Sequence, residues 1–282
     1  MIVNKLFFLP VLISLSLSGI TEKKPGTPKP EPPNATNKSS GKTIKLFNGK
    51  NLDGWYTFIK ERGRDNDPKN VFTVKDEMIH ISGEEWGCIT TSNEYENFSL
   101  VAEFKWGGKT FEPRVNNARD GGILIHSRGQ DGGYSGTWMH GIECQIIEGG
   151  TGDLLVVGDG SSNFAITCPV ASEKQKGSYL FKENGDKVTI HGGRINWWGR
   201  DEDWDDVKDF RGKQDVEKPF GEWNKMECIA VGRNISIFLN GVLVNHAENV
   251  LPSKGRIQIQ SEGAEILFRR VDMIMLPGKK KK

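Results

Sequence analysis

The residues best suited to chemistry lie in the segment 120–153, where two short alternating runs flank a glycine-rich loop. Successive side chains of a β-strand point to opposite faces of its sheet. His126 and Arg128 would therefore share one face of the first run, and Glu143 and Gln145 one face of the second. An imidazole, a guanidinium, a carboxylate and an amide would then lie together above an apolar layer. This grouping predicts a functional site.

Three of these residue types have definite roles in proton transfer. His126 is the leading candidate for a general base, because the ordinary pKa of histidine lies near neutrality. Glu143 or Glu148 could serve instead if burial raised the carboxyl pKa. Arg128 stays charged, so it would stabilise a developing negative charge or anchor a substrate.

A divalent metal ion is an open possibility at the same place, and no other cofactor is expected. His126 and Glu143 are the candidate ligands, and Glu148 and His140 could add to them. A metal held there would act as a Lewis acid on a bound substrate. The spacing of these residues matches no fixed ligand motif, so the sequence leaves the metal undecided.

Other polar and aromatic side chains are candidates for contacts with a substrate. Flat tryptophan faces beside carboxylates and amides suit pyranose rings, although the tryptophans of the segment 195–224 could instead fill one end of the fold. The strand-like segment 257–262 would place alternate polar residues on one face. The candidates for substrate binding are Gln145, Glu148, Glu103, Lys105, His140, Trp138, Trp197, Trp198, Gln258, Gln260 and Glu262.

The elements that must position these residues read as strands. Many short alternating runs are separated by turns rich in Gly and Asn, such as the hairpin signal Asn240-Gly241. No segment sustains the 3.6-residue apolar period of a helix. The segment 195–224 interrupts the series as a long irregular insertion. The pattern predicts an all-β fold of two packed sheets.

The ends of the chain have a different composition. Lys5 and the apolar run Leu6–Leu17 resemble a secretory signal, so we expect residues 1–19 to be a signal peptide and the protein to be exported, periplasmic or extracellular. Residues 20–43 form a linker rich in Pro, Lys and Ser, which cannot bury apolar surface. The folded domain would span residues 44–276, and residues 277–282 would be a basic tail.

Composition excludes some partners and leaves the cysteines open. The net charge of +1 gives no general attraction to nucleic acid or to an anionic membrane. The apolar run near the amino terminus is shorter than the roughly 20 residues of a membrane span. The four cysteines, Cys88, Cys144, Cys168 and Cys228, could pair after export or remain as buried thiols.

Several fragments, taken in order, resemble the bacterial 3-keto-disaccharide hydrolase family. They cover nearly the whole folded region, and they are Leu46–Trp55, Gly121–Leu124, Gly141–Ile146, Gly221–Asn224, Leu239–Gly241, Gly255–Gly263 and Phe268–Val271. The resemblance implies a concanavalin A/laminin-G-like jelly-roll β-sandwich. It also implies an enzyme that cleaves glycosides already oxidised to a ketone at C3, by proton abstraction at C2, elimination and hydration. The substrate would be an oxidised (3-keto) disaccharide or glycoside, supplied by a sugar 3-oxidoreductase.

Two other functions remain compatible with the sequence. The first is a non-catalytic, lectin-like carbohydrate-binding module, because folds of this class serve many purposes. The second is a conventional glycoside hydrolase, which needs two carboxyl groups about 5–5.5 or 6.5–9.5 Å apart. Gln145 stands where a carboxylate partner of Glu143 would be expected, which favours elimination beside a ketone over direct hydrolysis.

Overall fold

The computed structural model describes residues 42–278, which form strands and loops without any α-helix. The expected signal peptide, the linker up to residue 41 and the last four lysines lie outside the described residues. The strands are β1 (Thr43–Lys45), β2 (Trp55–Ile59), β3 (Gly63–Arg64), β4 (Phe72–Lys75), β5 (Met78–Ile81), β6 (Gly87–Thr91), β7 (Phe98–Thr110), β8 (Asp120–Arg128), β9 (His140–Ile147), β10 (Leu154–Val157), β11 (Ala165–Val170), β12 (Tyr179–Leu180), β13 (Asp186–Ile190), β14 (Gly193–Asn196), β15 (Asn224–Val231), β16 (Asn234–Leu239), β17 (Val242–Leu251), β18 (Arg256–Ser261) and β19 (Ala264–Met275).

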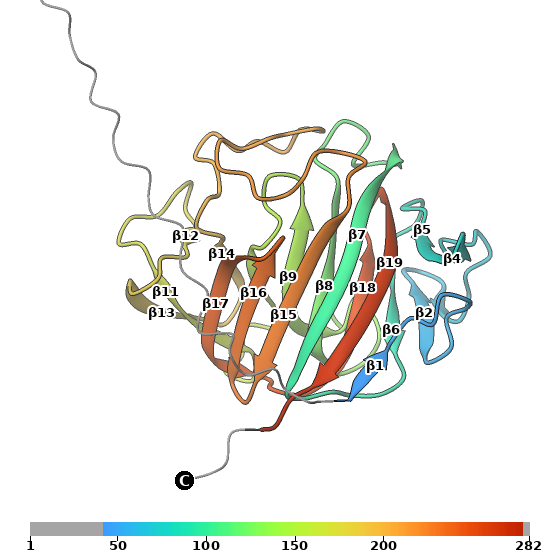
Figure 1. The fold of residues 1–282 in the computed structure, drawn as a ribbon, viewed down its shortest axis with the longest axis horizontal. Coiled ribbons are helices and arrows are strands. Elements are labelled where there is room, and N and C mark those ends of the chain that lie inside the picture. The colour runs from blue at the N-terminus through green and yellow to red at the C-terminus, as the bar shows by residue number, and fades with distance from the viewer. Residues whose placement is uncertain (1–41, 279–282) are drawn as a thin grey trace, which may run out of the picture.

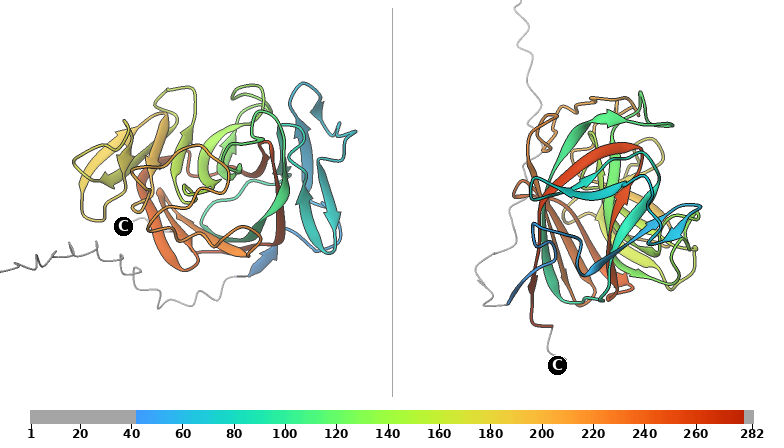
Figure 2. Two further views of the ribbon diagram at one scale, coloured as in Figure 1. Left: turned by 90° about the horizontal axis from the view of Figure 1, so that it is seen from above. Right: turned by 90° about the vertical axis from the view of Figure 1, so that its right-hand side faces the viewer.

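Hydrogen bonding joins these strands into two sheets (Figure 1). The ten-stranded sheet has the order β13-β11-β17-β16-β15-β7-β19-β5-β4, with β1 also paired to β19. The nine-stranded sheet has the order β12-β14-β10-β9-β8-β18-β6-β2-β3. Figure 2 shows the two layers from two further directions. This arrangement confirms the all-β, jelly-roll sandwich of the concanavalin A/laminin-G type that was expected.

The core lies between the sheets and is built by alternation. On β9, Ile142, Cys144 and Ile146 point inward and are fully buried, as predicted. Large side chains of the other sheet, including Phe104 and Phe268, meet them. Burying one such side chain contributes about 1.5–3 kcal/mol. The opposite faces of β8, β9 and β18 are therefore free to carry polar residues.

Hairpin turns hold the strands in register where the sequence predicted them. Asn240 and Gly241 join β16 to β17 with φ angles of 51° and 85°. Two positive φ angles in succession are typical of a type I′ turn, which asparagine and glycine adopt readily.

All four cysteines are buried thiols in this structure. The Sγ atoms of Cys144 on β9 and Cys228 on β15 lie 3.5 Å apart across the core, so the thiols touch without being bonded. Cysteine therefore packs here as a small apolar residue. In residues 42–278 no helix is long and apolar enough to cross a membrane.

Candidate active site

The candidate site lies on the face of the nine-stranded sheet that is turned away from the core, which we call the polar face. Strand register places Glu143 of β9 opposite Leu124 of β8, and Leu124 opposite Gln258 of β18. The next row contains Gln145 of β9 opposite Gly122 of β8. The predicted neighbourhood of β8, β9 and β18 is thus confirmed.

Gly122 creates the space in which two of these side chains meet. A Cβ atom at this position would overlap Oε1 of Gln260 and Oε1 of Glu143. The two side chains therefore approach each other above a residue that has no side chain of its own. The requirement for glycine here arises from close packing, and it brings an amide beside the Glu143 carboxyl.

Three carboxyl groups gather at one end of the polar face. Asp120, the first residue of β8, accepts a hydrogen bond from Gln145 Nε2 at 2.8 Å, and it also pairs with Arg114. The backbone N–H of Gly121 donates to the same Oδ1 atom, at 3.0 Å. Glu143 and Glu262 are close enough to Asp120 for the charges to influence each other.

Burial and mutual repulsion separate the protonation states of these carboxyls. Burial raises the pKa of Glu143 to about 8, and the charge of Asp120 adds to the shift. Burial also raises the pKa of Asp120, but Arg114 and Arg194 oppose this, so it reaches only about 6. The pKa of Glu262 rises well above its ordinary value, again through burial first. Near neutral pH, Asp120 is therefore ionised while Glu143 is protonated.

The polar face also carries buried polar atoms that lack a partner among the described residues. These are Oε1 of Gln145, Oε1 of Gln260 and Nε1 of Trp138. Gln260 is only 1% exposed, so the missing hydrogen bond is not supplied by bulk solvent. An unsatisfied buried polar group costs about 1–3 kcal/mol. Unpartnered polar atoms next to carboxyls with raised pKa values are typical of a ligand-binding site.

An aromatic group closes one side of the polar face. Trp138, from the loop between β8 and β9, packs against Leu124. Its ring lies 5.7 Å from that of Trp86 and 6.4 Å from that of Tyr134, measured between centroids. Met139, the next residue, donates its backbone N–H to Oε1 of Gln258 at 3.0 Å. The structure thus brings Trp138 and Gln258 together with Glu143, as the sequence suggested.

His126 does not lie on the polar face, contrary to the alternation argument. β8 and β9 are in register at Ile125 and again at Arg128, and a bulge lies between. His126 has a φ of 54° in this bulge, which reverses the direction of its side chain. Its ring packs edge-on against Phe98 in the core, 5.6 Å away between centroids. Burial lowers the pKa of His126 to about 4.

The bulge also displaces the other residues predicted near His126. Arg128 is exposed at the far end of β8, where its Nε donates to the carbonyl of Lys254 at 2.7 Å. His140 is partly buried at the start of β9 and lies 3.1 Å from the carbonyl oxygen of Gly133. Neither residue joins the carboxyl cluster at the opposite end of β8.

Glu103 and Lys105 are on the wrong sheet for the predicted role. Both belong to β7, in the ten-stranded sheet, and the sequence gives no signal for which sheet a strand will join. Glu103 pairs with Arg269 and Arg270. Lys105 lies 4.9 Å from the ring centroid of Trp223. Both interactions are on the surface of the other sheet.

Three further candidates for substrate binding do not lie on the polar face. They are Glu148, Trp197 and Trp198, and each is held by contacts within the protein. Glu148 accepts from Arg119 at 2.5 Å and from the backbone of Asp209 at 3.0 Å. Trp197 is buried in the core, and Trp198 packs against it while donating to the carbonyl of Leu243 at 2.8 Å. Their indoles fill the end of the sandwich, which was the alternative to sugar binding.

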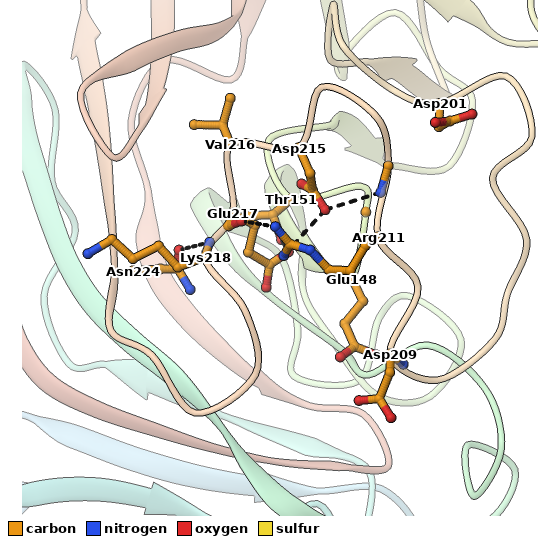
Figure 3. Close-up of polar contacts among 12 residues, drawn as sticks. Glu148, Thr151, Asp201, Asp209, Arg211, Asp215, Val216, Glu217, Lys218 and Asn224 are labelled. Carbon is orange, nitrogen blue, oxygen red and sulfur yellow. Dashed lines mark hydrogen bonds and ion pairs between the residues drawn. The ribbon is translucent and has the colours of Figure 1, made fainter.

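The long insertion predicted from the sequence is an irregular loop over residues 197–223, and it lies at the top of Figure 1. A buried carboxyl anchors its second half (Figure 3). Glu217 accepts hydrogen bonds from Trp106 Nε1 and Thr151 Oγ1, each at 2.8 Å. Burial raises the pKa of Glu217 to about 8. Arg211 donates to the Glu217 carbonyl at 2.5 Å, which closes the loop on itself. The contacts of Glu217 with Trp106 of β7 and with Thr151 after β9 tie the loop to the rest of the sandwich.

The candidate metal ligands do not form a site. His126 faces the core and Glu143 faces the opposite side of the sheet, so their donor atoms do not converge. Residues 42–278 contain no group of three or more His, Cys, Asp or Glu side chains placed to hold a metal ion. The donor set therefore does not fit the divalent ion considered from the sequence.

The sequence reasoning missed three charged residues of the site. Asp120 shares the alternation of Leu124 and could have been found from it, but it stands at the strand boundary. Arg194 lies on β14, whose register places it opposite Leu155, and Leu155 opposite Glu143. Arg114 belongs to a loop and carried no periodic signal.

A known family covers nearly all of the described residues. The family described as the 3-keto-alpha-glucoside-1,2-lyase-like domain matches residues 42–273. The chain belongs to this family. This membership supports a carbohydrate-active, glycosyl-hydrolase-like enzyme. No curated protein matches the sequence significantly.

Solved structures with a similar course of the chain are distant in sequence. A "putative glycosyl hydrolase" from Parabacteroides distasonis is 19% identical, covers 84% of this chain and 94% of that chain, and has a TM-score of 0.49. The carbohydrate-binding module CBM66 from Bacillus subtilis is 13% identical over 78% and 95% of the two chains, with a TM-score of 0.39. The β-glucanase of Bacillus licheniformis is 10% identical over 85% and 100%, with a TM-score of 0.43.

Proposed function

We propose that this 3-keto-alpha-glucoside-1,2-lyase-like protein cleaves glycosides whose sugar carries a ketone at C3, using the carboxyls of the polar face. The observation that carries the proposal is the opposite protonation of two neighbouring carboxyls. Asp120 has a pKa of about 6 and Glu143 of about 8, so near neutral pH one can accept a proton and the other can donate one. Environments that drive two pKa values apart identify an acid and a base.

The reaction requires these two roles together. The C3 ketone makes the C2 proton acidic, and Asp120 accepts that proton. The electrons of the C2–H bond form an enolate and then a C1–C2 double bond, while the C1–O bond breaks. Glu143 donates its proton to the departing oxygen, which leaves as an alcohol. Addition of water to C1 reverses both roles, since Glu143 takes a proton from the water and Asp120 returns its proton to C2.

The remaining groups of the polar face fit the rest of this reaction. Arg194 is partly exposed, and its charge lowers the pKa of both Asp120 and Glu143, so a guanidinium is available near an enolate oxygen. Gln145 and Gln260 offer unpartnered carbonyl oxygens to sugar hydroxyls. Asp120 replaces His126 as the base in this proposal, because the imidazole lies on the other side of the sheet.

Turnover of an oxidised disaccharide tests the proposal directly. The protein is incubated with a 3-keto-disaccharide, and release of the free sugar is followed by chromatography. Asp120→Asn and Glu143→Gln should each suppress release, whereas Arg128→Met should not, because Arg128 lies at the far end of β8. Failure of the wild-type protein to release sugar, with and without added divalent metal, would count against the reaction.

We propose further that the protein is exported and acts after a sugar 3-oxidoreductase. The apolar run behind Lys5 supports export, and the need for a ketone supports an oxidising partner. Cell fractionation with an antibody checks the first point, since a cytoplasmic location contradicts it. Reconstitution checks the second: an unoxidised disaccharide should be cleaved only when a sugar 3-oxidoreductase and its electron acceptor are also present.

One observation favours a second candidate, a conventional glycoside hydrolase. In the structure, Asp120 and Glu262 lie near enough to Glu143 to influence its charge. Glu143 therefore has carboxyl neighbours, although position 145 of its own strand is a glutamine. Cleavage of an unoxidised glycoside by the purified protein alone would support this function over ketone-dependent elimination. Glycan binding without turnover of either substrate would support a lectin-like module.

A further inference from the structure

Two cysteines meet in the core, and each comes from a different sheet. Cys144 belongs to β9 of the nine-stranded sheet, and Cys228 belongs to β15 of the ten-stranded sheet (Figure 1). The two residues are 84 positions apart in the sequence, yet their Sγ atoms are 3.5 Å apart. The exposed fractions of the two side chains are 0% and 2%. Two groups that can react with each other are therefore in contact at a place that the proposed reaction does not use.

Strand alternation directs both thiols into the space between the sheets. On β9, Cys144 lies between Glu143 and Gln145, whose side chains are on the polar face. On β15, Cys228 shares the side that faces the core with Met226 and Ala230. The S–S bond of a disulfide is about 2.05 Å long, so each sulfur atom would have to move by less than about 1 Å. Small rotations about the two Cα–Cβ bonds supply such a movement, so neither strand has to leave its sheet.

The other two cysteines lie too far from this pair to compete with it. Cys88 is on the polar face, where its Sγ atom accepts from Nε2 of Gln258 at 3.2 Å, so the sheet itself separates it from Cys144. Cys168 is on β11, and the strands β17 and β16 lie between β11 and β15. Three strand spacings of about 4.8 Å therefore separate Cys168 from Cys228. Because Cys144 touches Cys228, Cys168 is remote from both.

An oxidising environment converts a pair of adjacent thiols into a disulfide by exchange with another disulfide. One cysteine thiolate attacks a sulfur atom of the oxidant, which forms a mixed disulfide and releases one thiol. The second cysteine then attacks the sulfur of the first, which releases the second thiol. Two cysteine thiols are thereby oxidised, one oxidant disulfide is reduced, and the two protons end on the released thiols. An exported protein, as proposed above, meets oxidants of this class after export.

We infer that Cys144 and Cys228 are joined by a disulfide bond when the protein folds in the presence of a disulfide oxidant. The bond links the two sheets through the core, and it ties β9, the strand of Glu143 and Gln145, to β15. It does not depend on the reaction proposed for the polar face. Its stabilising effect arises largely in the unfolded chain, where the bond closes a long loop and removes conformational freedom.

The bond forms during folding, because the folded protein shields both thiols. Contact with Cys228 and burial raise the pKa of the Cys144 thiol well above its ordinary value, so almost no thiolate is present in the folded state. An oxidant also needs access to a sulfur atom, and both side chains are almost fully buried. The protein must therefore be oxidised while it refolds.

Refolding in a defined redox buffer tests the inference. The protein is unfolded in guanidinium chloride with a reductant, and it is then refolded either with a mixture of oxidised and reduced glutathione or with reduced glutathione alone. Alkylation in denaturant, followed by measurement of the intact mass, counts the free thiols. The first sample should carry two alkyl groups, on Cys88 and Cys168, and peptide mapping should show the peptides of Cys144 and Cys228 linked. The second sample should carry four alkyl groups.

Thermal unfolding of the same two samples gives a second measurement. The oxidised protein should have a Tm higher by roughly 5–15 °C, which is the usual effect of a disulfide in a domain of this size. Equal Tm values in two samples that both carry four free thiols would contradict the bond.

Matched variants make the test specific. Cys144→Ala and Cys228→Ala should each keep three free thiols and lose the difference in Tm between the two buffers. Cys168→Ala also removes a buried thiol from the core, but it should keep both the bond and the difference in Tm. Four free thiols in wild-type protein refolded with oxidised glutathione overturn the inference, and so does a bond that includes Cys88 or Cys168. The thiol count of the wild type does not require any variant to fold.

Discussion

Replacing Glu143 by glutamine is the sharpest perturbation of the proposed chemistry. A pKa of about 8 leaves most Glu143 side chains protonated at neutral pH, so the wild-type protein holds the proton that the leaving oxygen needs. Glutamine has the same shape and can still hydrogen-bond the substrate, but it cannot transfer a proton. General acid catalysis contributes about 10²–10⁴-fold to a rate. We therefore expect kcat to fall by about that factor while KM changes less than about threefold.

The assay is release of free sugar from a 3-keto-disaccharide at saturating substrate. Glu96→Gln is the matched control, because Glu96 is exposed and lies away from the polar face. Thermal unfolding should show that Glu143→Gln is at least as stable as the wild type at alkaline pH, since the substitution removes a buried group that ionises there. A kcat within tenfold of the wild type in a folded Glu143→Gln protein would refute the assignment of Glu143 as the acid.

Three further predictions use the same geometry. The pH profile of kcat/KM should be bell-shaped, rising through about 6 as Asp120 ionises and falling through about 8 as Glu143 loses its proton; a plateau from pH 5 to 9 contradicts both roles. His126→Asn should keep kcat within about threefold of the wild type, because the imidazole faces Phe98 in the core. A fall in kcat as large as that of Glu143→Gln would instead identify His126 as the base. The folded pKa of Glu217 is raised from 4.5 to about 8, so the folded state holds this proton more tightly than the unfolded state. Stability should therefore fall as pH rises through that window, by on the order of 5 kcal/mol at most, and urea unfolding at pH 5 and pH 8 should show a smaller fall for Glu217→Gln.

Much of the polar face follows from the sequence because strand alternation is a local property. The inward placement of Cys144 and the outward placement of Glu143 and Gln145 required only a period of two residues. The strand that carries Gln258 and Gln260 was also predicted to place both side chains on one face, and it pairs with β8, the neighbour of β9. These residues needed no knowledge of the rest of the fold.

The errors occur where a non-local feature or a single backbone angle decides. His126 obeys the alternation of its strand until the bulge turns it inward. A positive φ is uncommon at a non-glycine residue, so alternation alone did not predict this bulge. Glu103 was placed correctly on a strand but assigned to the wrong sheet, because sheet membership depends on long-range pairing. Arg114 and Arg194 reach the cluster from a loop and from a strand of only four residues, which carry almost no periodic signal.

The different protonation states of Asp120 and Glu143 follow from how the cations are distributed around them. Arg114 pairs with Asp120 and also with Asp206, so part of its charge is directed away from the polar face. Arg194 is shared with Asp153, which already pairs with Arg200. The cations that remain can hold one carboxylate of the cluster ionised but not three, since each further ionisation would bury an uncompensated charge. Asp120 ionises first because an arginine, an amide and a backbone N–H all donate to it, and its charge then keeps Glu143 protonated. The protonation states of the acid and the base therefore depend on one charge balance. A substitution that removes the charge of Asp120 must also lower the pKa of Glu143.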